Sequence, residues 1–189
     1  MRRTIALALA LLICLYLCAC GSRNIAEITN IEETSIVTEE TISEPDSIEL
    51  VLGETYSLPL FDVTITGFDF TEKATFPEGG SFTVTPKAGY VTANLYYDVK
   101  YTAKAALDSS WLTPGFLYYD DGYSFILEKF YYYDASFDSW LNSGTIDPLT
   151  PEFPCKACFF VPVEVSENAE ASLYIQFDVG NKEAIYKVR

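Results

Sequence analysis

The chain has 189 residues, carries a formal net charge of −15 and contains no histidine. Its acidity argues against a nucleic-acid partner, because phosphate backbones are also negative. Without histidine there is no Ser-His-Asp or Cys-His catalytic group, and the commonest metal ligand is missing. No serine lies in a Gly-x-Ser-x-Gly motif. We therefore expect no enzyme activity and no cofactor or metal, although a hydrolase with paired carboxylates is left open.

Residues 1–19 predict a lipoprotein signal peptide. Two arginines precede an apolar run over 5–17, which suits a secretory leader but is short for a transmembrane helix. The motif that follows, Leu17-Cys18-Ala19-Cys20, resembles the lipobox of bacterial lipoproteins. It implies that Cys20 is acylated, with palmitate for example, because the small Ala19 precedes it, whereas the larger Leu17 precedes Cys18. An ordinary secretory peptide or an uncleaved anchor is the alternative.

Residues 20–46 predict a lipidated cysteine followed by an acidic, flexible tether. Six Glu and one Asp outnumber a single Arg over 21–46, and the segment has no aromatic residue. A short helix or an edge strand around 34–38 is the alternative. The lipid on Cys20 would hold the protein at the extracytoplasmic face of the cell membrane, with the tether as a spacer.

Residues 47–189 predict one all-β domain. The clearest pattern is the alternation of apolar and polar side chains over 91–102, and similar patterns occur over 61–66, 81–85, 173–179 and 184–188. Segments rich in Gly, Pro and Asp separate these runs. Only 166–171 predicts a turn of helix. About seven to eight strands separated by turns predict an antiparallel β-sandwich.

The order of several features carries a family resemblance. Gly53-Glu54 opens a strand, a second strand ends near Gly67, and a long strand covers 89–102. An Asp-Asp-Gly hairpin follows at 119–123, and further strands end at 162 and 177. This order resembles the immunoglobulin-like, telokin-like domains of unknown function in lipoproteins of Gram-positive bacteria. The resemblance implies an immunoglobulin-like sandwich and a place at the membrane, and it implies no reaction and no catalytic residues.

Cys155 and Cys158 form a C-x-x-C motif at a place where that family more usually has glycines. A structural disulfide, two unpaired thiols and a redox-active pair are the alternatives. Oxidising surroundings outside the membrane favour a disulfide. The residues around the motif predict a strand, however, and side chains at i and i+3 of a regular strand point to opposite faces. A strand also lacks the helix N-terminus that normally stabilises a reactive thiolate.

The segment Asp120-Asp121-Gly122 has two interpretations. The two carboxylates of Asp120 and Asp121 could begin a Ca²⁺ site, because hard cations bind clustered carboxylates. The spacing matches no EF-hand loop, and Asp and Gly are also typical of tight hairpin turns. We expect the turn.

Aromatic residues mark 109–153 as the first place to look for a binding surface. Consecutive aromatic residues on a strand cannot all face the core, so some lie outside it or beneath a loop. Exposed Tyr and Trp side chains favour stacking on sugars or packing against proteins. We therefore expect a non-catalytic module for another cell-envelope protein, or alternatively a small-ligand or glycan binder. The candidate ligand-binding residues are Trp111, Tyr118, Tyr119, Tyr132 and Trp140.

Overall fold

The computed structural model describes residues 47–76, 82–120, 122–180 and 182–189. The predicted signal peptide, the lipidation site Cys20, the tether and Asp121 lie outside the described residues. In the described part, no helix is both long and apolar enough to cross a membrane.

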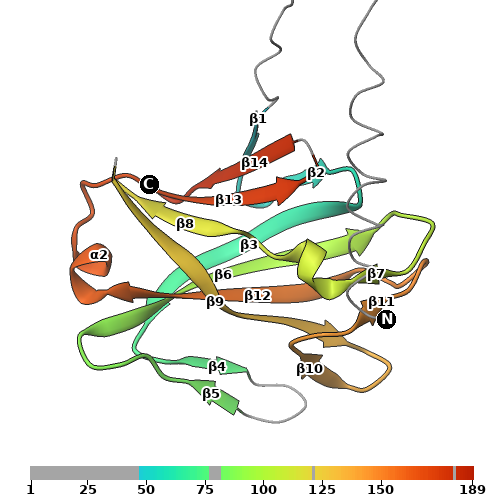
Figure 1. Cartoon of the computed structure of the whole chain (residues 1–189), viewed down its shortest axis with the longest axis horizontal. Helices are drawn as coiled ribbons and strands as arrows, with labels where there is room; N and C mark the ends of the chain where they lie inside the picture. The colour runs from blue at the N-terminus through green and yellow to red at the C-terminus, as the bar shows by residue number, and fades with distance from the viewer. Residues whose placement is uncertain (1–46, 77–81, 121, 181) are drawn as a thin grey trace, which may run out of the picture. The chain divides into compact units, whose positions relative to one another are not determined.

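Strands dominate the described chain (Figure 1). A 3₁₀ helix, η1 (Ser109–Leu112), and a short α-helix, α2 (Val163–Glu167), interrupt them. The strands are β1 (Ser47–Leu50), β2 (Thr55–Ser57), β3 (Phe61–Thr71), β4 (Ala74–Phe76), β5 (Phe82–Val84), β6 (Tyr90–Tyr101), β7 (Leu107–Asp108), β8 (Phe116–Tyr119), β9 (Tyr123–Asp134), β10 (Ser139–Leu141), β11 (Thr145–Ile146), β12 (Phe153–Pro162), β13 (Leu173–Val179) and β14 (Lys182–Lys187).

Ten of the described strands form one sheet. Nine of them follow the order β1-β14-β13-β8-β9-β12-β6-β3-β2, and β10 pairs with β9 off this path. The long strand β9 joins two layers, because 123–126 pair with β8 and 127–132 pair with β12. A bulge at Glu128 accompanies this change of partner, since Cys158 lies opposite Lys129 while Phe159 lies opposite Leu127. A β-bulge bends a strand, so β9 can pass from one layer to the other.

The sandwich has more strands than the seven to eight predicted, and one pair of strands is parallel. The first part of the domain is divided into β1, which pairs in parallel with β14, and β2, which pairs antiparallel with β3. Gly53 lies between them with φ 79°, a left-handed conformation that favours glycine. At four and three residues, β1 and β2 are too short to show a clear period of two.

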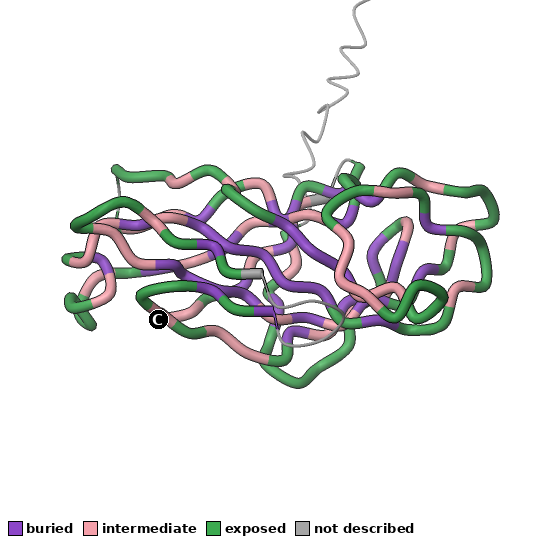
Figure 2. The backbone as a smooth tube through the Cα atoms, turned by 90° about the horizontal axis from the view of Figure 1, so that it is seen from below, coloured by how far each residue is buried: buried purple, intermediate pink, exposed green. Residues whose placement is uncertain are grey.

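The main core lies between the two layers. Along β6 and β13 the alternating apolar side chains predicted from the sequence are buried, and the rings of Tyr97 and Phe177 meet edge to face at 5.4 Å. The Tyr97 hydroxyl donates a hydrogen bond of 2.9 Å to the Leu112 carbonyl, so the buried phenol is satisfied. Figure 2 shows the buried positions concentrated toward the middle of the domain and the exposed positions toward its periphery.

A second, smaller cluster lies on the other face of β12 and β9, beneath the β4–β5 hairpin. Phe76 of the hairpin packs with Tyr131 and Cys158. The layer that contains β9 and β12 is therefore covered on both faces, by the main core on one and by the β4–β5 hairpin on the other.

The short helix also differs in position from the predicted turn at 166–171. It begins at Val163, directly after Pro162, whose fixed φ suits a helix start. The chain leaves the helix at Asn168.

Candidate functional site

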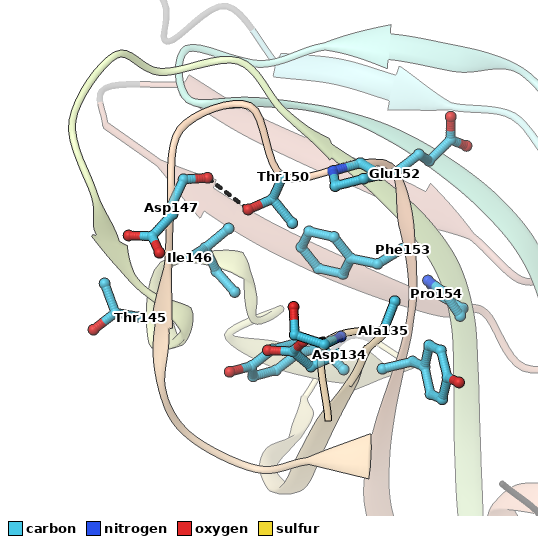
Figure 3. Close-up of a pocket in the computed structure, with 13 residues that line it drawn as sticks. Asp134, Ala135, Thr145, Ile146, Asp147, Thr150, Glu152, Phe153 and Pro154 are labelled. Carbon is cyan, nitrogen blue, oxygen red and sulfur yellow. Dashed lines mark hydrogen bonds between the residues drawn. The ribbon is translucent and has the colours of Figure 1, made fainter. Parts of the chain in front are cut away.

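A cavity of about 390 Å³ lies at one end of the sandwich, between the β9–β10 turn and the segment 145–154. We call it the end cavity (Figure 3). Tyr132, Ile146 and Phe153 form its floor, and all three belong to the main core. The Ile146 and Phe153 side chains point into the space from opposite walls, and the Tyr132 and Phe153 rings lie 5.8 Å apart. Each of these three side chains is no more than 5% exposed, so only a small edge of each faces the cavity.

Acidic side chains surround this apolar floor. Asp134, Asp147 and Glu152 line the cavity, and none of its described lining residues is Lys or Arg. The Asp147 and Glu152 carboxylates extend outward on its two sides (Figure 3). The ion pairs found among the described residues, Lys129–Glu128 and Lys187–Glu49, involve none of these three acids. The rim therefore carries negative charge that no ion pair within the described protein balances.

Turn hydrogen bonds hold the walls. The Asp134 carboxylate accepts a 2.8 Å hydrogen bond from the Ser136 N–H, and the Thr150 hydroxyl donates a 2.6 Å bond to the Asp147 carbonyl. Gly144 approaches Tyr132 so closely that a Cβ at this position would overlap the Tyr132 hydroxyl. Any other residue at position 144 therefore forces the Tyr132 ring to shift.

Two groups near the end cavity have a raised pKa, through burial first and nearby carboxylates second. Burial, together with the nearby Asp134, raises the pKa of the Tyr132 phenol, so the phenol stays protonated and available as a donor. Burial and the charge of Glu152 raise the pKa of Asp98, which lies with Glu152 in a neighbouring hollow. Burial is the larger cause of both shifts, and the neighbouring carboxylates add to it.

The five aromatic candidates do not form one surface. Tyr132 lies in the end cavity, whereas Trp111 in η1 is 52% exposed. Trp140 on β10 packs against the Phe76 ring and Tyr133 at the second cluster. Tyr119 points toward the main core, where its hydroxyl accepts a 2.9 Å hydrogen bond from the Asn168 side chain.

Tyr118 lies on the outer face of β8. Its ring stacks on Tyr174 with centroids 4.9 Å apart, and the two rings line a shallow hollow with Tyr123 and Asp120. Asp120 adopts φ 51°, as expected for a hairpin turn. Among the described residues, no three Asp, Glu, Cys or His side chains are grouped closely enough to hold a metal ion.

The disulfide suggested as one alternative for the C-x-x-C motif is not formed. Cys155 and Cys158 are both free and buried on β12, one in the main core and the other in the second cluster. They point to opposite faces because β12 stays regular and the extra residue of the bulge lies on β9. Burial raises the pKa of Cys155, and it raises that of Cys158 to about 12. Neither thiol therefore has the thiolate character of a redox site.

A polar cluster beneath the β4–β5 hairpin was not predicted from the sequence. Fully buried Asn94 donates hydrogen bonds of 2.7 Å to Asp69 and 2.9 Å to Thr71, and it accepts one from the Cys158 thiol. Lys156, also buried, places Nζ over the Phe76 and Tyr96 rings and donates to the Thr75 carbonyl. We call Asn94, Lys156 and Cys158, together with the exposed Asp69 that accepts from Asn94, the buried polar cluster.

The acids of the end cavity were also missed. The aromatic run 131–133 directed attention to this region, and the cavity lining falls within 132–154. The available signal was the segment 147–154, where Pro148, Pro151 and Pro154 alternate with acids and Phe153. Pro148 and Pro151 disfavour a regular strand over 147–152, so Asp147 and Glu152 lie in the loop that precedes β12.

One solved structure resembles this chain. It is an uncharacterized β-sandwich protein from Clostridium difficile, with a TM-score of 0.65 and 22% sequence identity. The match covers 77% of this chain and 97% of that chain. No protein-family model and no curated protein matches the sequence. At this identity the likeness shows the fold alone, and the chain is accordingly a β-sandwich protein.

Proposed function

We propose that this chain is a lipid-anchored, extracytoplasmic binding protein. In this proposal Cys20 attaches it to the cell membrane and residues 21–46 form the spacer. Its sandwich, of the immunoglobulin-like type, binds a small ligand in the end cavity without catalysing a reaction. The lipobox motif supports the anchor, and the absence of histidine from the sequence supports a non-catalytic role.

The end cavity is the observation that carries the binding function. Its volume of about 390 Å³ falls within the range of small-molecule sites, and an apolar floor with a few polar groups is typical of them. Ile146 and Phe153 are core side chains that a ligand would contact directly. A ligand there would cover the small exposed edges of these core side chains.

Metabolic labelling with an alkyne analogue of palmitate tests the anchor. We expect label on the wild type and on Cys18→Ala, and none on Cys20→Ala, which should leave the membrane fraction. Label that persists on Cys20→Ala would contradict the proposed attachment point.

A fragment screen by protein NMR tests the cavity. Binding fragments should shift the amide resonances of 132–136 and 145–153. Ala135→Trp, which fills the cavity from the β9–β10 turn, should abolish these shifts, whereas Ala169→Trp in an exposed turn should retain them. Shifts confined to other surfaces would contradict a ligand site in the end cavity.

A second candidate is docking of another cell-envelope protein on the outer face of β8 and β13. Phe116 pairs across the strands with Ile126 and Tyr118 pairs with Tyr174, which leaves a row of partly exposed apolar side chains. Exposed apolar side chains gathered on one face favour a protein interface. In-cell crosslinking should then recover a partner that Ile126→Glu loses and Ile126→Val keeps.

A further inference from the structure

We propose that the end cavity selects a small organic cation, such as an amine with an aromatic or aliphatic body. This inference rests on the proposed function, because it names the ligand class of the same cavity. The apolar body would contact the floor of the cavity, and the cationic group would lie among the acids of the rim.

The charge of the rim is the first support. Asp134, Asp147 and Glu152 belong to a chain with net charge −15, and no described lining residue is basic. A cation entering the cavity would gain Coulomb attraction from all three carboxylates, and an anion would meet repulsion from the same groups. An anionic sugar or carboxylate is therefore disfavoured.

The floor is the second support. The Tyr132 and Phe153 rings lie at this floor, Tyr133 also lines the cavity, and Ile146 faces Phe153 from the opposite side. Aromatic faces attract organic cations through the ring quadrupole, and the hydrocarbon part of an amine buries apolar surface against the same side chains. A hydrated inorganic cation gains nothing from such walls.

The spacing of the acids separates an organic cation from a metal ion. Ca²⁺ requires six to eight oxygen ligands at short range. The three carboxylates do not converge on one point, because those of Asp147 and Glu152 extend to opposite sides, and no metal-binding group occurs among the described residues. A dispersed negative rim suits a larger cation whose charge acts over several ångströms.

Three probes of nearly equal shape test the charge preference with the mature chain: phenethylamine, 2-phenylethanol and 3-phenylpropanoate. They carry positive, zero and negative charge on the same phenylalkyl body. We expect phenethylamine to bind about tenfold more tightly than 2-phenylethanol, from charge attraction and cation–π contact. We expect no binding of 3-phenylpropanoate. Titration by NMR locates each probe through the amides of 132–136 and 145–153.

A charge-matched pair of triple variants provides the control. Asp134→Asn, Asp147→Asn and Glu152→Gln together should remove most of the preference for phenethylamine over 2-phenylethanol. The asparagine at 134 retains the oxygen that accepts from Ser136. Glu164→Gln, Glu167→Gln and Glu170→Gln change the net charge equally in and just after α2. That region follows the far end of β12, roughly 30 Å away for ten strand residues. This second variant should keep the preference.

A capped Phe-Lys dipeptide amide tests whether the cation is a basic side chain of a protein or a free amine. Tighter binding of the dipeptide than of phenethylamine assigns the cation to a basic side chain of a protein, and the reverse order assigns it to a free amine. Both orders support a cation site.

Equal binding of phenethylamine and 2-phenylethanol in the cavity would overturn the charge preference while leaving the ligand-binding function intact. Resonance shifts by Ca²⁺ alone at the same amides, with none by phenethylamine, would also overturn it. No shift in the cavity with any probe or fragment would overturn both proposals.

Discussion

The end cavity and the buried polar cluster both place carboxylates beside aromatic rings, but their polar groups have different partners. In the buried polar cluster Asp69 accepts from Asn94, and Lys156 lies between two rings beneath the β4–β5 hairpin. In the end cavity, Asp147 and Glu152 extend outward without an ion-pair partner among the described residues. In the buried polar cluster the polar groups bond to one another and stabilise the fold. In the end cavity the carboxylates keep a negative charge that can attract a ligand.

This contrast predicts which substitutions lower stability and which lower binding. The largest loss of stability is expected at Asn94. Asn94→Ala removes two donors and the acceptor of the Cys158 thiol in a fully buried place. The free energy of unfolding should fall by about 2–3 kcal/mol in urea titrations.

The exposed Asn142 provides the control for this experiment, because Asn142→Ala should change stability by less than about 0.5 kcal/mol. Phenethylamine affinity at the end cavity should be unchanged in both variants. A change in affinity for Asn94→Ala, with little loss of stability, would reverse the roles assigned to the two regions.

Gly144→Ala should affect both stability and binding. The added Cβ overlaps the Tyr132 hydroxyl at the cavity floor, so the ring must shift. We expect a loss of about 1–3 kcal/mol in the free energy of unfolding and weaker phenethylamine binding. Gly122→Ala, where the added Cβ meets no atom within 4 Å, should be nearly neutral.

A double variant tests the cause of the Gly144→Ala effect. Tyr132→Phe removes the oxygen that the new Cβ meets, so Gly144→Ala with Tyr132→Phe should recover the part of the lost stability that the overlap causes, while the backbone strain at Gly144 remains. A double variant as unstable as the sum of the two single variants would show that the overlap with the hydroxyl is not the cause.

The two cysteines test the contrast between the faces of β12. Cys155→Ser places a hydroxyl in the apolar main core and should cost about 1–3 kcal/mol. Cys158→Ser should cost less, because the Asn94 carbonyl oxygen that accepts from the thiol can accept from a hydroxyl. Chemical denaturation of the two variants measures the difference, and equal losses would contradict the different surroundings of the two thiols.

The smallest expected effect concerns pH. The pKa of Asp98 is raised in the folded protein by burial and by Glu152. A raised carboxyl pKa contributes stability below the unfolded value near 3.8, and this contribution is lost as pH rises through the folded value. Asp98→Asn should therefore stabilise the protein at neutral pH by about a few tenths of a kcal/mol, since solvent screens the group.

The gain in Tm from Asp98→Asn should disappear below about pH 4, where the wild-type carboxyl is protonated in both states. A scan of Tm against pH for both proteins checks the sign. A lower Tm of Asp98→Asn at neutral pH would show that the ionised carboxylate is favourable, in contradiction to a rim of unbalanced negative charge.

Part of the sandwich could be predicted, because a periodic pattern identifies β3, β6 and β13, although none identifies the long strands β9 and β12. The alternation over 91–102 and 173–179 corresponds to β6 and β13, whose apolar faces are buried. The change of layer by β9 could not be predicted, because it depends on a bulge at Glu128. The pairing of β1 with β14 could not be predicted for a different reason, because it joins segments that are more than 130 residues apart in the sequence.

The candidate site was predicted only in part for a similar reason. Aromatic residues in a run, such as Tyr131 and Tyr132, indicate that some leave the core, and the structure places these two on opposite faces of β9. The sequence does not show which strand end remains open, because that depends on how the β9–β10 turn lies against the segment 145–154. The acids of the rim can be identified as candidate site residues only once that arrangement is known.

A crystal structure with 4-bromophenethylamine tests the central claim most directly, because the anomalous signal of bromine locates the probe independently of the protein map. We predict a bromine peak between Ile146 and Phe153, with the amine directed toward the acids of the rim. Bromine at the Tyr118–Tyr123 hollow, with none in the end cavity, would contradict the account.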